Sequence, residues 1–306
     1  MTEPSSLPEN CPLCGSADAA PYYAKYGYAL VRCLICQAIY VHPMPSAAEL
    51  QAHYQQAAYF EGANDQGYLN YADMQKALRP HFQRRVQIVE RHVPARGYLL
   101  DFGCAAGYFL EMAQTHGWQI AGVELSHQMA QRAAQRVKTP IYPALDELPN
   151  RNFAAITLWE VIEHVANPIE LLRQLYARLK PGGLLMLSTP NTGHWQAVRA
   201  KDLWVSYRPP SHLQYFTRST LNTALRQAGF DRVEISGVSP LPPLPGWLHH
   251  MARPLEQSLA TGQARPWRLA LLTWRGIRML GWGWQKIAHS HDDIFATLEA
   301  LAFRPT

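Results

Sequence analysis

YLLDFGCAAG, residues 98–107, joins a short apolar run that ends in an acid to a turn rich in glycine and alanine. The apolar run is typical of a buried strand, and the apolar residues from Phe109 to Ala113 predict a helix after the turn. Glycines at 103 and 107 let the backbone approach a ligand, and the start of a helix offers unpaired N–H groups. The stretch therefore predicts a strand, a ligand-binding turn and a helix.

The chain on either side of this stretch alternates between predicted strands and helices. The strands are expected at 119–123, 153–159, 184–189, 231–236 and 294–301, and the helices at 127–137, 168–179 and 218–229. Lys180-Pro181-Gly182-Gly183 is expected to be a turn. Such alternation predicts an α/β fold, with a Rossmann-like parallel sheet and helices on both of its faces.

Four cysteines form two closely spaced pairs near the N-terminus. Cys11 and Cys14 are one CxxC pair, Cys33 and Cys36 are the other, and 18 residues separate the pairs. Two such pairs can place four thiolates around one ion, which is the closed tetrahedral arrangement of structural Zn²⁺. We therefore predict a four-cysteine zinc ribbon; the alternative is four buried free cysteines.

The segments predict four units along the chain. They are a zinc ribbon at 1–45, a helical linker or cap at 46–96, an α/β domain at 97–237 with an insert at 192–217, and a C-terminal helical extension with the last strand at 238–306. Ser46 and Glu49 have the spacing of a capping box at the start of one linker helix. A second linker helix is expected at 73–93.

Composition bounds the class of protein. The chain has 306 residues, is 48% hydrophobic and carries a formal net charge of only +5. The N-terminus has no basic and apolar leader, and no apolar run reaches about 18 residues, the length of a spanning helix. These features predict a cytoplasmic protein in which cysteines are more often metal ligands than disulfides.

A run of motifs resembles one known family. DFGCAAGYFLEMA, GVELS and LWEVIEHVANPIELLRQLYARLKPGGLLMLSTPN follow each other within residues 97–237. Together they resemble the class I S-adenosylmethionine (SAM)-dependent methyltransferases, especially the branch of ubiquinone-biosynthesis O-methyltransferases. The resemblance implies a SAM site on Asp101, Gly103, Ala105, Gly107, Glu124, Leu145, Trp159 and Glu160.

The family pattern assigns a part of the cofactor to each of these positions. Asp101 and the glycine-rich turn would hold the methionine part, and Glu124 would hold the ribose. Ala105 stands where the family usually has a glycine. Its methyl group would crowd the cofactor if its φ were positive, but alanine fits if φ is negative.

Two histidines are candidate general bases for methyl transfer. His164 follows the strand at 153–159, and His212 lies in the insert at 192–217. A histidine with a pKa near neutrality suits removal of a proton from an acceptor. For each, a structural role as a cap or hydrogen-bonding residue is the alternative. The insert also carries aromatic residues, which either contact a planar acceptor or pack the insert itself.

The C-terminal extension contains a helix with tryptophan and arginine. Within 264–288, Trp267, Ala270, Trp274, Ile277 and Trp284 recur at helical spacing, and the cations fall toward the other side. This pattern predicts either peripheral contact with a membrane interface or a helix packed on the catalytic domain.

Three functions are compatible with the sequence. The first is SAM-dependent methyl transfer to a small-molecule acceptor such as a lipid, a sugar or a polyketide-like compound, on oxygen, with carbon or nitrogen as the alternative. The second is an RNA methyltransferase whose zinc ribbon recognises the nucleic acid. Residues 1–45 argue against a nucleic-acid partner, because Lys25 and Arg32 are outnumbered by three acids there. The third is a non-catalytic SAM-binding or zinc scaffold protein.

Overall fold

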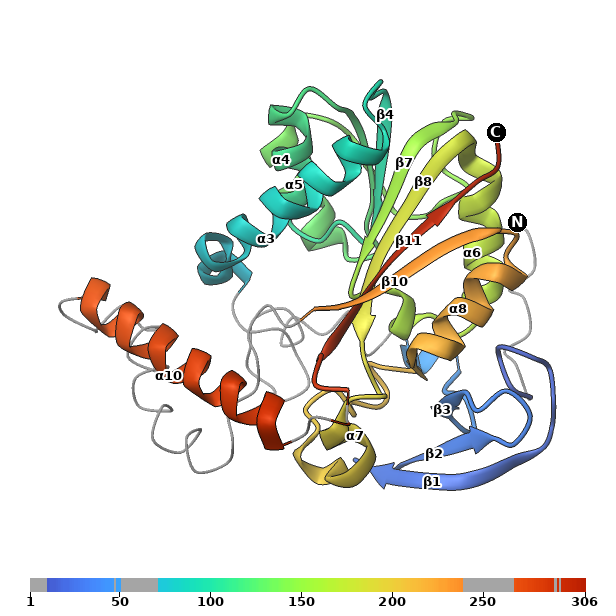
Figure 1. Ribbon diagram of the computed structural model, residues 1–306. Helices are drawn as coiled ribbons and strands as arrows, with labels where there is room; N and C mark the ends of the chain where they lie inside the picture. The colour runs from blue at the N-terminus through green and yellow to red at the C-terminus, as the bar shows by residue number, and fades with distance from the viewer. Residues whose placement is uncertain (1–9, 47, 51–70, 239–266, 289–290, 292) are drawn as a thin grey trace.

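The fold is a layered α/β domain with a small sheet beside it and a helix that stands apart (Figure 1). The structure, a computed structural model, describes residues 10–46, 48–50, 71–238, 267–288, 291 and 293–306. Its strands form a seven-stranded sheet and a four-stranded sheet. The α/β class predicted from the alternating pattern is therefore confirmed.

The large sheet has the strand order β10-β11-β8-β7-β4-β5-β6. Its strands are β4 Tyr98–Phe102, β5 Gln119–Val123, β6 Ile141–Tyr142, β7 Phe153–Trp159, β8 Leu179–Pro190, β10 Arg232–Val238 and β11 Thr297–Phe303. Strands β4 to β8 pair in parallel, whereas β11 is antiparallel to both β8 and β10. The last strand thus lies between β10, at one edge of the sheet, and β8, and its two pairings are the antiparallel ones.

Strand β8 begins earlier than the pattern predicts. Phe153 pairs with Leu179 and Ala155 pairs with Leu184, so four residues of β8 lie opposite the single residue Ala154 of β7. The segment 180–183, predicted as a turn, is therefore a bulge within the strand, with Gly182 at a φ of 71°. Bulges of this kind re-aim a strand without ending it.

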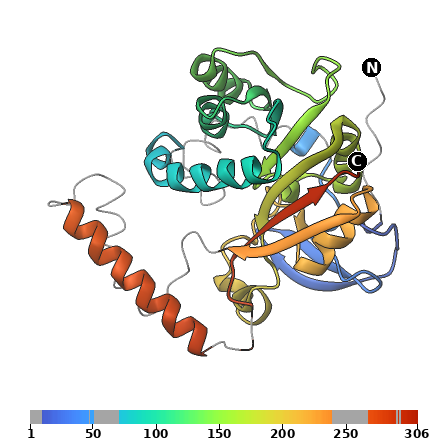
Figure 2. The same ribbon diagram turned by 45° about the horizontal axis from the view of Figure 1, so that its top comes forward.

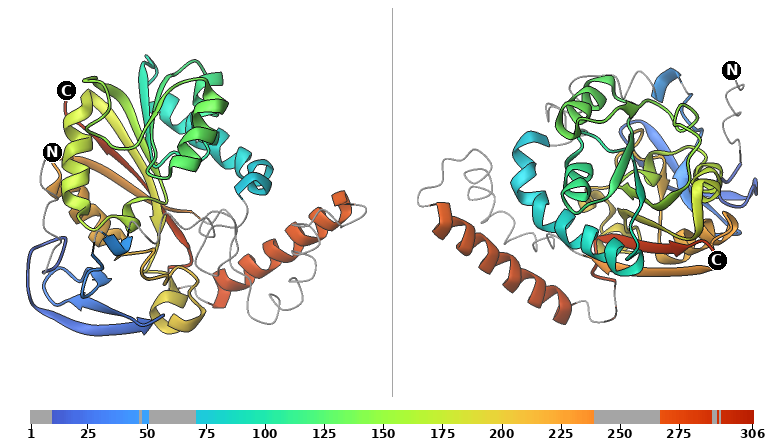
Figure 3. Two further views of the ribbon diagram at one scale, coloured as in Figure 1. Left: turned by 180° about the vertical axis from the view of Figure 1, so that it is seen from behind. Right: turned by 90° about the horizontal axis from the view of Figure 1, so that it is seen from above.

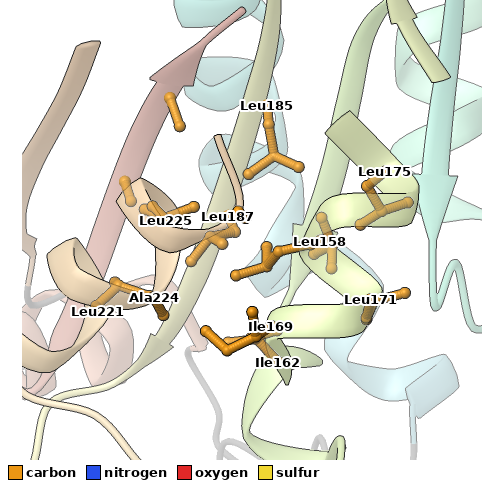
Figure 4. Close-up of a cluster of buried hydrophobic side chains, with 14 of the residues drawn as sticks. Leu158, Ile162, Ile169, Leu171, Leu175, Leu185, Leu187, Leu221, Ala224 and Leu225 are labelled. Carbon is orange, nitrogen blue, oxygen red and sulfur yellow. The ribbon is translucent and has the colours of Figure 1, made fainter. Parts of the chain in front are cut away.

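Helices cover both faces of the large sheet (Figures 1 and 2). On one side lie α3 Tyr71–His92, α4 Tyr108–Thr115 and α5 His127–Val137; on the other lie α6 Pro168–Arg178 and α8 Arg218–Gln227. Each side has its own buried cluster. In Figure 4, leucines of β7 and β8 meet Leu171 and Leu175 of α6 and Leu221 and Leu225 of α8. These buried leucines leave the polar ends of the strands as the place for a site.

The N-terminal strands form the second sheet together with the insert. β1 Ala19–Lys25, β2 Tyr28–Cys33 and β3 Ile39–Val41 are followed in strand order by β9 Gln214–Tyr215. All three pairings are antiparallel. Because β9 belongs to the insert at 192–217, the ribbon and the insert share one sheet.

The insert also packs against the ribbon through side chains. Its helices are α7 Trp195–Arg199 and η2 Lys201–Leu203. The hydroxyls of Tyr22 and Tyr207 lie 3.1 Å apart, and Lys201 Nζ donates to the carbonyl of Tyr22 at 2.9 Å. Trp204, Tyr207 and Tyr215 are all buried in this contact. These three aromatic residues therefore pack the insert onto the ribbon.

The linker and the C-terminal helix complete the description. The predicted capping box is present: Ser46 N donates to Glu49 Oε2 at 2.7 Å, and Glu49 N donates to Ser46 Oγ at 3.2 Å. The rest of that helix lies outside the described residues. Helix α10, Trp267–Ala288, extends away from the layered domain (Figure 3). Among the described residues, no helix is both long and apolar enough to cross a bilayer.

Candidate functional site

The turn between β4 and α4 is built on left-handed backbone. Gly103 and Gly107 both have a φ of 77°, and Gly107 caps α4 without a side-chain hydrogen bond to the helix N–H groups. The N–H groups of Gly103 and Cys104 both donate to Val123 O, at 2.8 and 3.0 Å. The turn is thus tied to the end of β5, where its backbone can meet a ligand.

Ala105 has a positive φ, the sign for which its methyl group is expected to crowd the cofactor. Its φ is 45°, so the left-handed conformation that usually belongs to glycine is taken by an alanine here. An L-residue in that region costs roughly 1–2 kcal/mol. This conformation directs the N–H of Ala105 to Glu124 Oε2 at 2.8 Å. The strain therefore accompanies a hydrogen bond that orients the acid.

Glu124 is held from two sides. Its second oxygen, Oε1, accepts a hydrogen bond from Ser126 N at 2.8 Å, and the residue is only 8% exposed. Burial raises the pKa of this carboxyl, and the N–H groups of Ser126 and Ala105 oppose that rise. Each oxygen keeps a further lone pair, so the fixed carboxylate can accept hydrogen bonds from paired hydroxyls.

Asp101 lies one strand away from Glu124, at the same edge of the sheet. It is 1% exposed, and Thr157 Oγ1 of the neighbouring β7 donates to its Oδ1 at 2.7 Å. Burial raises the pKa of Asp101 to about 7, while the Thr157 hydrogen bond and Arg85 act against the rise. Glu124 adds a smaller upward contribution.

The end of β7 contributes Trp159 and Glu160. Glu160 has a φ of 55°, and its Oε1 accepts a hydrogen bond from Ser188 Oγ at 2.7 Å. The Trp159 ring packs edge-on against Phe109, with centroids 4.9 Å apart, and the Arg85 guanidinium lies 4.2 Å from its centre. Both side chains are therefore fixed before any ligand binds.

Leu145 is the remaining predicted cofactor residue. It follows β6, is 8% exposed and belongs to the same buried cluster as Val123, the residue before Glu124. Its backbone carbonyl accepts a hydrogen bond from Leu148 N at 3.4 Å. Leu145 thus offers an apolar wall on the side of β5.

His164 and His212 lie together although 47 residues separate them. Their ring centroids are 4.8 Å apart and their planes are nearly perpendicular. His164 Nδ1 lies 2.6 Å from Ser211 O, and His212 Nδ1 lies 2.8 Å from Ser206 O. A carbonyl only accepts, so Nδ1 carries the proton in each ring and Nε2 of each is the basic nitrogen.

Glu163 joins the two histidines and was missing from the predicted site. One carboxylate oxygen of Glu163 and one ring nitrogen each of His164 and His212 lie within 4.8 Å of one another. Thr189 Oγ1 donates to Glu163 Oε2 at 2.9 Å. The sequence shows Glu163 beside His164, but no pattern in it reveals that the acid is 1% exposed.

Burial disfavours the charged forms of Glu163 and His212. Burial raises the pKa of Glu163 well above its usual range, with Glu160 adding to the effect. Burial also lowers the pKa of His212, and His164 and Arg208 lower it further. A neutral imidazole is the form that can take up a proton, which is what a general base requires.

The ribbon reaches this cluster through backbone hydrogen bonds. Leu213 N donates to Glu163 O at 2.7 Å, and Val41 N of β3 donates to Leu213 O at 3.0 Å. Ile39 and Tyr40 of β3 pair with Tyr215 and Gln214 of β9. The position of His212 is therefore coupled to the third strand of the ribbon.

The four cysteines of the ribbon converge on one point. Their sulfur atoms lie within 4.8 Å of one another, with Cys11 and Cys36 Sγ 3.4 Å apart and Cys14 and Cys33 Sγ 3.6 Å apart. None is in a disulfide. Four sulfurs at zinc-bond length from one ion would lie about 3.8 Å apart, so the donor set fits a closed tetrahedral site.

Each cysteine pair sits on a similar tight turn. Gly15 N donates to Cys11 O at 2.8 Å, and Gln37 N donates to Cys33 O at 3.1 Å. Gly15 and Gln37 have φ values of 75° and 63°. Two matching turns that each present two thiols are the expected form of a zinc knuckle.

Comparison with known proteins places this geometry in a family. A family model described as a methyltransferase domain matches residues 72–235, more than half of the chain. A ubiquinone biosynthesis O-methyltransferase of Coxiella burnetii (strain Dugway 5J108-111) is 31% identical over 135 residues, covering 41% of this chain and 58% of that protein. One from Nitrosospira multiformis is 26% identical over 172 residues, covering 51% and 72%. The chain thus spans about 58% of the length of the Coxiella relative.

Two solved structures share the fold. A SAM-dependent methyltransferase from Archaeoglobus fulgidus superposes with a TM-score of 0.52 at 18% identity, covering 78% of this chain and all of that one. Phosphoethanolamine N-methyltransferase 2 of Haemonchus contortus, in complex with S-adenosyl-L-methionine, gives 0.57 at 18% identity, covering 88% and 62%. With the family match and the glycine-rich turn at the strand ends, these findings place the chain in the class I SAM-dependent methyltransferase family.

Proposed function

We propose that this protein binds SAM at the carboxyl ends of β4, β5 and β7 and transfers its methyl group to a small-molecule acceptor. Asp101 and the turn from Gly103 to Gly107 hold the methionine part, and Glu124 holds the ribose. Leu145, Trp159 and Glu160 flank the cofactor. The observation that carries this proposal is the pair of buried acids on adjacent strand ends, one of them fixed by two backbone N–H groups.

SAM supplies an already activated methyl group on a positively charged sulfur. The task left to the chain is to align the acceptor and take up its proton. We assign that proton transfer to His164 or His212, whose basic Nε2 atoms are oriented by the carbonyls of Ser211 and Ser206. Taking up the proton at Nε2 would place a positive charge on the imidazole, and the loss of the sulfonium charge on methyl transfer would offset it, so the buried site would gain no net charge.

The acceptor is a lipid, a sugar or a polyketide-like compound, methylated on oxygen. The oxygen preference is supported by the similarity to ubiquinone biosynthesis O-methyltransferases. RNA is the alternative acceptor. The ribbon offers little positive charge for it, because residues 1–45 carry only Lys25 and Arg32 as cations against three acids.

Zn²⁺ held by Cys11, Cys14, Cys33 and Cys36 completes the proposal. Four thiolates leave no open position, so the ion stabilises the ribbon and takes no part in methyl transfer. Its stabilising effect would reach the candidate bases through the pairing of β3 with β9 and the side-chain contacts of Tyr22 with the insert.

Two measurements test this function. Calorimetry of the zinc-loaded protein should show SAM binding at one site, and Glu124→Gln should weaken it, because an amide cannot accept at both atoms. Protein with labelled SAM is then offered lipid, saccharide and RNA fractions. Absence of SAM binding in the intact protein, and also in Ala105→Gly, would leave the non-catalytic scaffold as the better reading.

A further inference from the structure

Helix α10 presents a continuous apolar stripe to solvent. Leu269, Leu272, Leu280 and Ile287 share one face of the helix. Gly276 and Gly283 lie on the same face, and each of these six positions is three or four residues from the next. Their exposed fractions are 62, 63, 75 and 77%, and Met279 and Trp284 beside the stripe are 64 and 56% exposed. Six large apolar side chains on one exposed helix are a contact surface rather than a normal protein exterior.

This stripe is not the apolar face that the tryptophan spacing predicts. Trp274 and Ile277 of that face are half-buried, whereas Trp284 is 56% exposed. The helix is therefore apolar on two sides, and the stripe is the more exposed of the two. Figure 3 shows the helix projecting from the domain in both views.

The charged residues of the segment that contains the stripe are all basic. Residues 264–288 carry Arg265, Arg268, Arg275, Arg278 and Lys286 and contain no acid. Lys286 is exposed, with its Nζ 3.6 Å from the centre of the Trp282 ring. These five cations equal the formal charge of the whole chain, which is +5. The partner of this helix should therefore be both apolar and anionic.

Two occupants fit this surface poorly. A bilayer-spanning position is excluded because α10 is not apolar enough to cross a membrane. A second copy of the chain would bring a segment with five cations and no acid against an identical segment, which is electrostatically unfavourable. An anionic lipid surface satisfies both the apolar and the basic requirement.

We propose that α10 lies in the plane of an anionic phospholipid bilayer, with the stripe Leu269–Ile287 in the acyl boundary. The helix has 22 residues and is about 33 Å long, so it contacts the surface along its whole length. Its cations lie at headgroup level, as does Trp284. The proposal is independent of the methyl acceptor, because it concerns where the protein is held and not what it modifies.

Vesicle flotation tests this proposal with the full-length protein. Vesicles of equal parts phosphatidylcholine and phosphatidylglycerol should carry the protein, and pure phosphatidylcholine vesicles should carry at least about tenfold less. Leu269→Gln with Leu280→Gln and Ile287→Gln should lower partition at least about tenfold. Leu203→Gln with Val205→Gln, two comparably exposed residues of the insert, is the matched control and should float as the wild type does.

A second pair of variants separates charge from apolar contact. Arg275→Gln with Arg278→Gln should weaken partition roughly 30-fold, whereas exposed Arg132→Gln with Arg173→Gln should change it less than about threefold. Circular dichroism and SAM binding confirm that each variant is folded. Failure of the intact protein to float, equal partition onto both vesicle types, or a dimer that the leucine variants convert to monomer would each overturn the proposal.

Discussion

The protonation of Asp101 should govern how tightly the protein binds SAM. Burial raises the pKa of this carboxyl to about 7, so the ligand-free protein holds it as the neutral acid in mildly acidic solution. SAM is cationic and needs the carboxylate. Below about pH 7 binding must therefore release one proton, and the Kd should rise about tenfold for each unit that the pH falls. Above pH 7 this contribution should be constant.

The same pKa predicts how the ligand-free protein responds to pH. The folded state binds a proton that the unfolded state has lost over the window between the usual pKa of 3.8 and about 7. Stability from this group is therefore full below that window and falls as the pH rises through it. The shift of roughly three units corresponds to about 4 kcal/mol of unfolding free energy.

Calorimetry from about pH 5.5 to about pH 8 measures the binding profile. Asp101→Asn should remove the slope and weaken binding about tenfold to hundredfold at the upper end, where it loses a charged hydrogen-bonding partner. Thr157→Val removes the hydroxyl that lowers the pKa of Asp101, so the break should move to higher pH. A flat wild-type profile, or a slope that survives in Asp101→Asn, would show that Asp101 does not pair with the cofactor.

Three further changes test the turn, the candidate bases and the ribbon. Ala105→Gly removes strain at a φ of 45° but adds freedom to the unfolded chain, so denaturant titration should show up to about 1 kcal/mol of added stability; a clear loss would contradict the strain. His164→Gln and His212→Gln, assayed separately for labelled methyl transfer, should identify the base by a loss of at least about a hundredfold with an unchanged Kd for SAM. Losses under about tenfold in both would exclude both. Cys14→Ser should abolish stoichiometric zinc in elemental analysis, and retained zinc would refute the closed four-cysteine site.

The central strands follow from the sequence because each is buried on both faces. An apolar run bounded by turn residues predicts its own limits, and β4, β5 and β7 begin and end where the pattern places them. Strand β9 has only two residues, Gln214 and Tyr215, and exists because β3 lies beside it. No local periodicity records a partner about 175 positions away. The bulge at 180–183 is not visible in the sequence either, because it depends on how β8 pairs with β7.

Some residues of the candidate site can also be predicted from the sequence, and others depend on contacts that only the fold creates. Asp101 and Glu124 are visible in the sequence because each closes a predicted strand. The positive φ at Ala105 is not visible, since alanine usually adopts a negative φ, and the hydrogen bond to Glu124 that accompanies the unusual sign is seen only in the fold. Glu163 is hidden because its burial depends on the insert that covers it. Leu213 of that insert donates directly to its carbonyl at 2.7 Å.

The ribbon and the histidine cluster are the two features that only the folded chain relates to each other. The proposed closed zinc site would neither bind an acceptor nor move a proton, so its effect on methyl transfer would be to hold other residues in place. The connection consists of three short steps: Cys33 and Cys36 flank the turn before β3, Val41 at the end of β3 donates to Leu213 O, and Leu213 N donates to Glu163 O. The two backbone hydrogen bonds that follow the cysteine turn are 3.0 and 2.7 Å long. We therefore expect a zinc-loaded ribbon to hold His212 in place, whereas a free insert of 26 residues would sample many positions.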